Sequence, residues 1–359
     1  MQVLEDQAPR TDAVAVPASK GAFSSQRNMP ALVLTGDEAE LDGVPNPPLG
    51  FVRRDELNQL RAALLAAGEG AMAITGAQGL GLHGQGGIGK TVLAVALARD
   101  TLLRRHFPDG IYWVTLGERP DLVGAQLDLL ARVEVRAGEV RSTLDGVKAL
   151  RETLADRRCL IVVDDVWSAA AAQAFDATGP QGRVLYTTRD PAALRDVRAQ
   201  VRRIEVLSAP AARQLLASLT AAAVSDLPDD VDRVLVATGR VALALALVGA
   251  AVGRGRRGWR EVADELEQTA GTFLEHPYAN VFKAMGVAVA TLDPELAAAH
   301  ETLAVYGEDT RVPIAAVARL WTHLYELTLA QTHERLALLA ERELVSISSF
   351  GISRVMAGL

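Results

Sequence analysis

The eight residues from Gly84 to Thr91 constrain this 359-residue chain more than any other stretch. Their sequence, Gly-Gln-Gly-Gly-Ile-Gly-Lys-Thr, matches the pattern G-x-x-x-x-G-K-[ST] at every specified position. Apolar residues at 79–83 predict a strand before the loop, and the alanines, leucines and valines after Thr91 predict a helix. Glycines let a backbone wrap a polyphosphate with its N–H groups inward, and the helix N-terminus adds a positive dipole end. The pattern predicts a phosphate-binding loop; the alternative is a glycine-rich turn with a chance lysine.

The side chains at the end of this loop predict how a nucleotide would be held. Lys90 would place a positive charge at the β and γ phosphates, and the Thr91 hydroxyl would bind Mg²⁺. The cofactor-binding residues expected in the loop are Gly84, Gly86, Gly87, Ile88, Gly89, Lys90, Thr91 and Val92.

A buried strand is predicted at 159–163, and it ends in two carboxylates, Asp164 and Asp165. Next to a phosphate-binding loop, Asp164 would hold Mg²⁺ through water, and Asp165 would orient or deprotonate the attacking water. The alternative is an acidic pair that caps the following helix. Cys159 is expected to be a small core residue.

Thr187-Thr188-Arg189-Asp190 ends the next predicted strand. Arg189 at that place could reach the γ-phosphate and report whether it is present, which adds Arg189 to the catalytic candidates Lys90 and Asp165. The alternative is a surface arginine paired with Asp190.

The order of elements predicts an α/β fold with a parallel five-stranded sheet, because apolar strands alternate with helices up to residue 207. The strands are expected near 79–83, 111–116, 159–163, 183–187 and 201–206, and the helices near 90–104, 121–132, 142–156 and 168–175. After Leu207 the strands stop, and helices are expected near 208–219, 229–237, 241–252 and 259–269, then near 294–305, 312–321 and 331–341 before a short hairpin. The expected domains are an irregular N-terminal tail or linker at 1–46, a nucleotide-binding α/β domain at 47–207, a small helical domain at 208–276 and a winged-helix domain at 277–359.

Composition excludes several classes of function. A net charge of −7 provides no basic field for nucleic acid or anionic lipid. One cysteine excludes an internal disulfide framework and favours a reducing, cytoplasmic location. No secretory signal is apparent, and the most hydrophobic run, 241–252, is shorter than the roughly 20 residues of a membrane span.

Taken in order, these motifs resemble the NB-ARC class of STAND P-loop NTPases, which includes apoptotic protease-activating factor and plant disease-resistance proteins. The resemblance covers roughly residues 46–356. Besides the loop, it rests on the segments Phe51–Glu56, Phe107–Val114, Leu160–Trp167, Thr187–Arg189 and Leu303–Trp321.

The resemblance implies an ATP/ADP-operated switch. A resting form would hold ADP between the three domains, exchange for ATP would open the module and allow ring assembly, and hydrolysis would be slow. Val52 and Arg54 would contact the adenine end, the backbone of Gly87, Gly89 and Lys90 would hold the phosphates, and ATP would be preferred over GTP.

Two departures from the family predict a weaker ADP lock. The proline of the family's Gly-Leu-Pro-Leu-Ala motif is replaced by Ala242, and the family's Met-His-Asp motif falls at Met356-Ala357-Gly358, so its histidine and aspartate are absent. Proline would offer a flat apolar face to the base, and a histidine would donate a charge-assisted hydrogen bond to the ADP phosphate.

Several alternatives stay open. The usual sensor and effector domains are absent from the sequence, so the chain is expected to be a fragment of a bacterial regulator or defence protein, or else a minimal switch with partners. It could bind nucleotide as a scaffold without turnover. A DNA-binding transcriptional regulator is disfavoured, because acidic residues outnumber basic ones ten to six in 273–359. The basic run 254–260 is either a solvated turn or an assembly surface.

Overall fold

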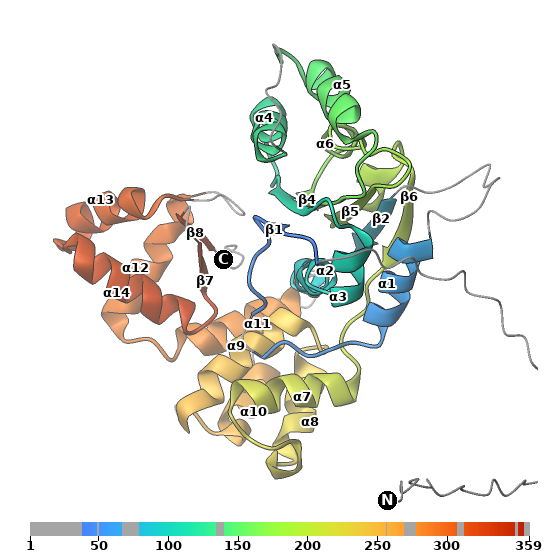
Figure 1. The fold of residues 1–359 in the computed structure, drawn as a ribbon. Coiled ribbons are helices and arrows are strands. Elements are labelled where there is room, and N and C mark those ends of the chain that lie inside the picture. Colours follow the sequence, from blue (N-terminus) through green and yellow to red (C-terminus); the bar gives the residue numbers. More distant parts are fainter. Residues whose placement is uncertain are drawn as a thin grey trace, which may run out of the picture. The chain divides into compact units, whose positions relative to one another are not determined.

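The computed structural model describes residues 38–48, 50–66, 79–133, 140–255, 257–268, 278–306, 312–348 and 351–354. An α/β region comes first in the chain, and helices with a short hairpin follow it (Figure 1). The predictions for residues 1–37 and for Met356-Ala357-Gly358 lie outside the described residues.

Within the described residues the main sheet has six parallel strands in the order β1-β3-β4-β5-β2-β6. Their bounds are Leu41–Asp42 (β1), Gly79–His83 (β2), Ile111–Thr115 (β3), Leu160–Val166 (β4), Arg183–Thr188 (β5) and Ala199–Arg203 (β6). The parallel α/β class is confirmed. Strands β2 to β6 overlap the five predicted strands, although β6 is shifted toward the N-terminus relative to its predicted range of 201–206.

The predicted count of five strands is wrong, because β1 lies in the stretch before residue 46 that was expected to be irregular. A two-residue strand is too short to leave a periodic pattern in the sequence. Pairing with β3 holds it, together with a 2.8 Å ion pair between the Asp42 carboxylate and the Arg132 guanidinium.

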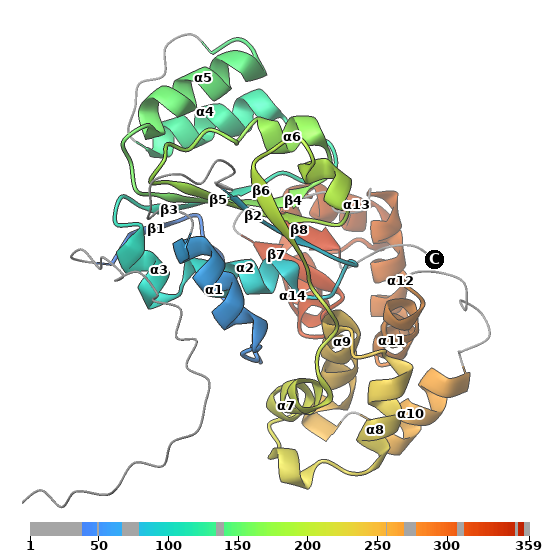
Figure 2. The same cartoon turned by 90° about the vertical axis from the view of Figure 1, so that its right-hand side faces the viewer.

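Alternate residues of the central strands face two separate apolar layers, as expected for a sheet covered on both sides. Ile111 and Trp113 face α1 (Glu56–Ala66), α2 (Lys90–Ala98) and α3 (Thr101–His106), whereas Tyr112 and Val114 face α4 (Leu122–Arg132), α5 (Thr143–Leu154) and α6 (Ala169–Gln173). Figure 2 shows the two groups of helices on opposite sides of the sheet.

One helix was predicted over 90–104, and the structure has two. The Asp100 side chain accepts hydrogen bonds from the N–H groups of Leu102 and Leu103, which begins α3 as a new helix. An aspartate at this position caps the orphan donors of a helix start, so its side chain favours a break in the continuous pattern.

Helices α7 (Ala209–Leu219), α8 (Asp230–Ala237), α9 (Ala242–Val252) and α10 (Trp259–Gln268) follow the sheet close to their predicted positions. Sequence reasoning missed α11 (Ala279–Val289), which packs against α9. Valines and a glycine give α11 weak intrinsic helix propensity, so its stability comes from packing.

The last described elements are α12 (Pro294–Thr302), α13 (Ile314–Tyr325), α14 (Leu329–Ala340) and an antiparallel hairpin of β7 (Val345–Ser348) and β8 (Gly351–Arg354). They share one apolar core with α7 to α11, and Trp321 is its largest fully buried side chain. Among the described helices, none is long and apolar enough to cross a membrane.

Candidate functional site

The loop between β2 and α2 has the backbone of an anion-binding cradle. Gly87 and Gly89 have φ values of 74° and 101°, which residues other than glycine rarely adopt. Gly89 is the N-cap residue of α2 and has no side chain to cap the helix, and the N-terminus of a helix attracts anions. The buried Lys90 ammonium donates to the carbonyl oxygens of Gly84 (2.8 Å) and Gln85 (3.0 Å) and thus closes over the loop.

Asp164 lies beneath this loop at the carboxyl end of β4. Its Oδ1 accepts hydrogen bonds from the hydroxyls of Thr91 (2.8 Å) and Thr187 (2.6 Å). Burial raises the pKa of the Asp164 carboxyl, although both hydroxyls favour its ionised form. Hydroxyl and carboxylate oxygens are the donors that Mg²⁺ prefers, so the set fits that ion. The described residues contain no cluster of three or more His, Cys, Asp or Glu side chains that could hold a metal ion.

Asp165, the next residue, has left-handed backbone with φ of 59°. The strand register shifts between Val163 and Val166, so Asp165 lies at a bulge in β4. Its N–H donates to the Thr187 hydroxyl at 2.9 Å, and its carbonyl accepts from Gly117. The bulge turns consecutive aspartates in different directions: Asp164 is buried, and Asp165 lines the cavity described below.

Arg189 follows β5 and lies over the Trp167 ring, with 4.7 Å between the guanidinium carbon and the ring centroid. The Asp190 side chain accepts from the Ala192 N–H at 2.8 Å and caps the short 3-10 helix Pro191–Leu194. The stacking gives Arg189 a defined place at the edge of the site.

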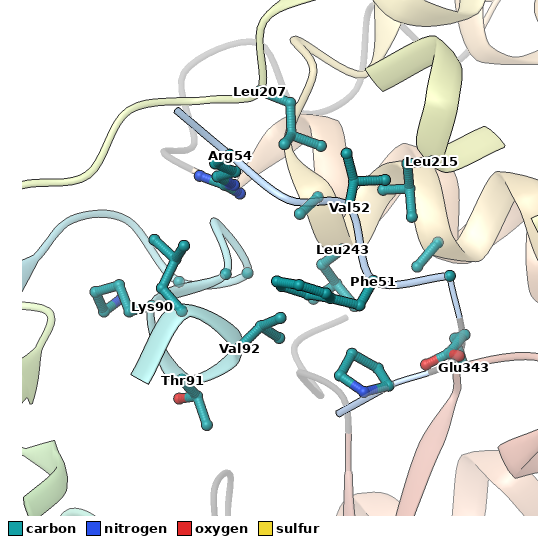
Figure 3. A pocket seen from close by; sticks show the side chains of 18 of the residues that line it. Phe51, Val52, Arg54, Lys90, Thr91, Val92, Leu207, Leu215, Leu243 and Glu343 are labelled. Carbon is teal, nitrogen blue, oxygen red and sulfur yellow. The ribbon is translucent and has the colours of Figure 1, made fainter. Parts of the chain in front are cut away.

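These residues surround a cavity of about 420 Å³ (Figure 3). Of the predicted site residues, eleven line it: Val52, Arg54, Gly86, Gly87, Gly89, Lys90, Thr91, Val92, Asp165, Arg189 and Ala242. Gly84, Ile88 and Asp164 do not line it. Asp164 is close to the cavity all the same, through its contact with Thr91.

Arg54 supports the phosphate-binding loop through a hydrogen bond to its backbone. Its guanidinium donates to the carbonyl oxygen of Ile88 in the loop and to that of Glu205 (3.1 Å), and burial lowers its pKa. Figure 3 places it beside the loop, whereas Val52 lies near Leu207 and Leu215.

Helix α9 meets the phosphate-binding loop through its backbone. The Leu243 N–H donates to the Gly87 carbonyl oxygen at 2.9 Å. Val241, the N-cap residue of α9, supplies no side-chain hydrogen bond, so the loop carbonyl satisfies one of the orphan donors of the helix. Ala242 is the first residue of that helix and lines the cavity.

Sequence reasoning missed several residues of the site. A Cβ atom added to Gly86 would lie 3.0 Å from the Tyr278 ring, so Tyr278 packs on the loop. Phe51, Leu215, Leu219 and Glu343 line the cavity from three different segments. Each is an ordinary residue in its local sequence. Phe51 belongs to the segment Phe51–Glu56, which carries part of the family resemblance.

Comparison with known proteins finds a matching family and several relatives. The model of the NB-ARC domain family matches residues 55–225. Apoptotic protease-activating factor 1 of Danio rerio is 28% identical over 298 residues, which cover 78% of this chain and 23% of that protein. A probable disease resistance protein of Arabidopsis thaliana is 26% identical over 281 residues, covering 77% of this chain and 33% of that protein.

A solved structure with the same fold is the Signal Transduction ATPase with Numerous Domains (STAND) protein with a tetratricopeptide repeat sensor from Pyrococcus horikoshii. Its TM-score is 0.58 at 17% identity, over 88% of this chain and 42% of that one. This chain thus spans about a quarter to two fifths of the length of these relatives. Residues 55–225 are therefore an NB-ARC domain, the nucleotide-binding domain of the P-loop NTPase class that the sequence motifs resemble.

Proposed function

We propose that this chain is a cytoplasmic ATP/ADP-operated switch, which holds ADP at rest, exchanges it for ATP to assemble, and hydrolyses ATP slowly. The observation that carries the proposal is the backbone hydrogen bond between the phosphate-binding loop and α9, which lies far along the chain. The Leu243 N–H bonds the Gly87 carbonyl oxygen, so a change in the loop backbone changes a contact with α9. A loop that only bound nucleotide would not need such a contact.

The phosphates would lie in the cradle of Gly87, Gly89 and Lys90. Anionic oxygens there would replace the two carbonyl oxygens that now accept from the Lys90 ammonium. Mg²⁺, held by Thr91 and through water by Asp164, would neutralise the developing charge on the phosphates. The 2.8 Å hydrogen bond between these two side chains supports their joint role.

Hydrolysis would use Asp165 to orient or deprotonate the attacking water. The bulge in β4 supports this role, because it directs Asp165 into the cavity while Asp164 stays beneath the loop. Arg189 would sense the γ-phosphate, and its stacking on the Trp167 ring beside the cavity supports this role.

The domain plan of the proposal follows the predicted boundaries at 47–207, 208–276 and 277–359. Three helices followed by a hairpin over α12 to β8 are consistent with a winged-helix domain. The packing of α11 on α9 supports moving the last boundary beyond residue 289. Ring assembly in the ATP state is proposed from the likeness to apoptotic protease-activating factor 1 and disease resistance proteins.

The experiment is to purify the chain, denature it, and identify the released nucleotide by chromatography. We expect ADP near one per chain. A chain purified under the same conditions with Lys90→Ala should release much less. A parent chain that carries no nucleotide, and that binds neither ADP nor ATP on titration, would contradict the proposal.

A further inference from the structure

Glu343 brings a carboxylate to the nucleotide cavity from the C-terminal part of the chain. It lies in the turn between α14 and β7 and is one of the residues that line the cavity. In Figure 3, Lys90 and Thr91 lie at one end of the cavity, and Glu343 lies at the other, beyond Phe51.

The turn that holds Glu343 is well defined. The Glu343 N–H donates to the Ala340 carbonyl oxygen at 3.0 Å, and the Leu344 N–H donates to the Leu339 carbonyl oxygen at 3.1 Å. Glu343 has a φ of 58°, a conformation that glycine adopts freely and glutamate rarely does. The backbone alone would therefore favour glycine here, so the choice of a carboxylate calls for a further reason.

The Glu343 side chain has no partner within the described part of the chain: neither a hydrogen bond nor an ion pair is present there. Burial, with no offsetting contact, raises the pKa of this carboxyl. A half-buried carboxylate facing a ligand cavity, with no protein group to satisfy it, points to donors on the ligand.

An adenine nucleotide offers two kinds of donor to such a group, the ribose hydroxyls and the amino group of the base. The apolar residues Val52, Leu215 and Leu219 suit the flat base, and Figure 3 shows Val52 and Leu215 together, away from Glu343. A vicinal diol presents two adjacent O–H donors that match the two oxygens of a carboxylate. An acidic residue on the ribose hydroxyls is also the solution used in dinucleotide-binding folds.

We propose that the Glu343 carboxylate accepts hydrogen bonds from the ribose hydroxyls of the bound nucleotide and sets its preference for ribonucleotides over 2′-deoxyribonucleotides. The proposal rests on the proposed function, since it needs an adenine nucleotide in the cavity. It also gives the C-terminal helices a direct contact with the ligand, which would add to the holding of ADP despite Ala242 and the absent histidine.

The test is calorimetric titration of ADP, 2′-deoxy-ADP and inosine diphosphate into the parent chain and into Glu343→Gly. Glycine fits the φ of this position, so the variant removes the carboxylate without straining the turn, and a thermal melt verifies its fold. We expect the parent to bind ADP about tenfold more tightly than 2′-deoxy-ADP. Glu343→Gly should bind the two with equal affinity.

A matched control is Glu341→Ala. Glu341 lies two residues before Glu343, is exposed and does not line the cavity, so this variant removes a negative charge near the site but not within it. It should keep the full preference for the ribose. A parent that binds ADP and 2′-deoxy-ADP equally, or a Glu343→Gly variant that keeps the preference, would overturn the assignment.

If the carboxylate instead reads the base, replacing Glu343 would abolish discrimination against inosine diphosphate and leave the sugar preference intact, which also overturns it. These results differ from failure of the proposed function, in which the parent would bind none of the three nucleotides.

Discussion

The two ends of the cavity are built in different ways. The phosphate end consists of one loop and the carboxyl ends of neighbouring strands, with the Thr91–Asp164–Thr187 hydrogen bonds at its centre. The opposite end is assembled from residues as far apart in the chain as Pro48 and Glu343, and apolar side chains predominate. In the proposed function, local elements would thus position the reacting groups, whereas recognition of the rest of the ligand would depend on the packing of distant segments.

The largest expected effect concerns the phosphate end alone. Asp165→Asn should lower the rate of ATP hydrolysis by about 10²- to 10⁴-fold, because it removes the group that would accept the proton of the attacking water. Asparagine tolerates left-handed backbone, so the φ of 59° is preserved and ADP affinity should change little. Single-turnover measurement of phosphate release checks the rate. An unchanged rate would favour a scaffold that binds nucleotide without turnover.

Lys90→Ala should weaken ADP binding by about 10- to 100-fold, since the loss of a charge-assisted hydrogen bond costs about 1.5–3 kcal/mol. Inorganic pyrophosphate, which occupies only the phosphate end, should lose affinity by a similar factor. Titration of both ligands tests this. Lys148→Ala, an exposed position on α5, is the matched control and should leave both affinities unchanged.

Phe51→Ala should act on the other end only. The ring lies in the cavity and is 37% exposed, so its removal should weaken ADP binding by about tenfold while stability stays nearly constant. Pyrophosphate affinity should be unaffected. If Phe51→Ala and Lys90→Ala reduced the affinity of pyrophosphate equally, the two ends would not be separable.

Ala242→Pro should raise the free energy of unfolding by about 0.4–1 kcal/mol. Ala242 is the first residue of α9, where the backbone N–H has no helical partner, and Val241 before it is extended, as a residue preceding proline requires. Thermal melts should show a Tm higher by about 1–4 °C. The same change at Ala246, inside the helix, should destabilise by about 3 kcal/mol and serves as the contrast.

The smallest effect is a pH dependence at Glu343. Its folded pKa is raised above the unfolded value, so its favourable contribution is fully present below the ordinary glutamate pKa of about 4.3 and is lost as pH rises through the folded pKa. Without added nucleotide, Glu343→Gln should therefore match the parent near pH 4 and become slightly more stable than the parent toward pH 7. Parallel melts across this range measure the difference; a difference that shrinks with rising pH would contradict it.

The fold was predictable where local pattern and final structure coincide. Strands β2 to β5 are mostly buried and rich in apolar residues, and α7 follows Ser208, whose hydroxyl accepts from the Ala211 N–H. Strand β1 and helix α11 were not predictable from local sequence propensity. Strand β1 is held by its pairing with β3, and α11 is held by its packing on α9.

The site divides in the same way. Lys90, Thr91 and Asp164 were predicted because phosphate and Mg²⁺ chemistry needs those residue types in a glycine-rich loop and at the end of a nearby strand. Tyr278 and Glu343 carry no such pattern, since their nearness to the loop and cavity arises only when distant segments pack together. Arg54 was predicted to contact the adenine end, and its bond to the Ile88 carbonyl oxygen, which supports the loop, could not be foreseen.

The bond from the Leu243 amide to the Gly87 carbonyl oxygen consists of main-chain atoms only. Among the substitutions at residue 243, only proline deletes the donor, and none at residue 87 deletes the acceptor. This hydrogen bond between loop and helix can thus be conserved while the surrounding side chains are substituted, and a sequence alignment would give little sign of it. Its presence in a relative is better judged from backbone geometry than from identity of residues.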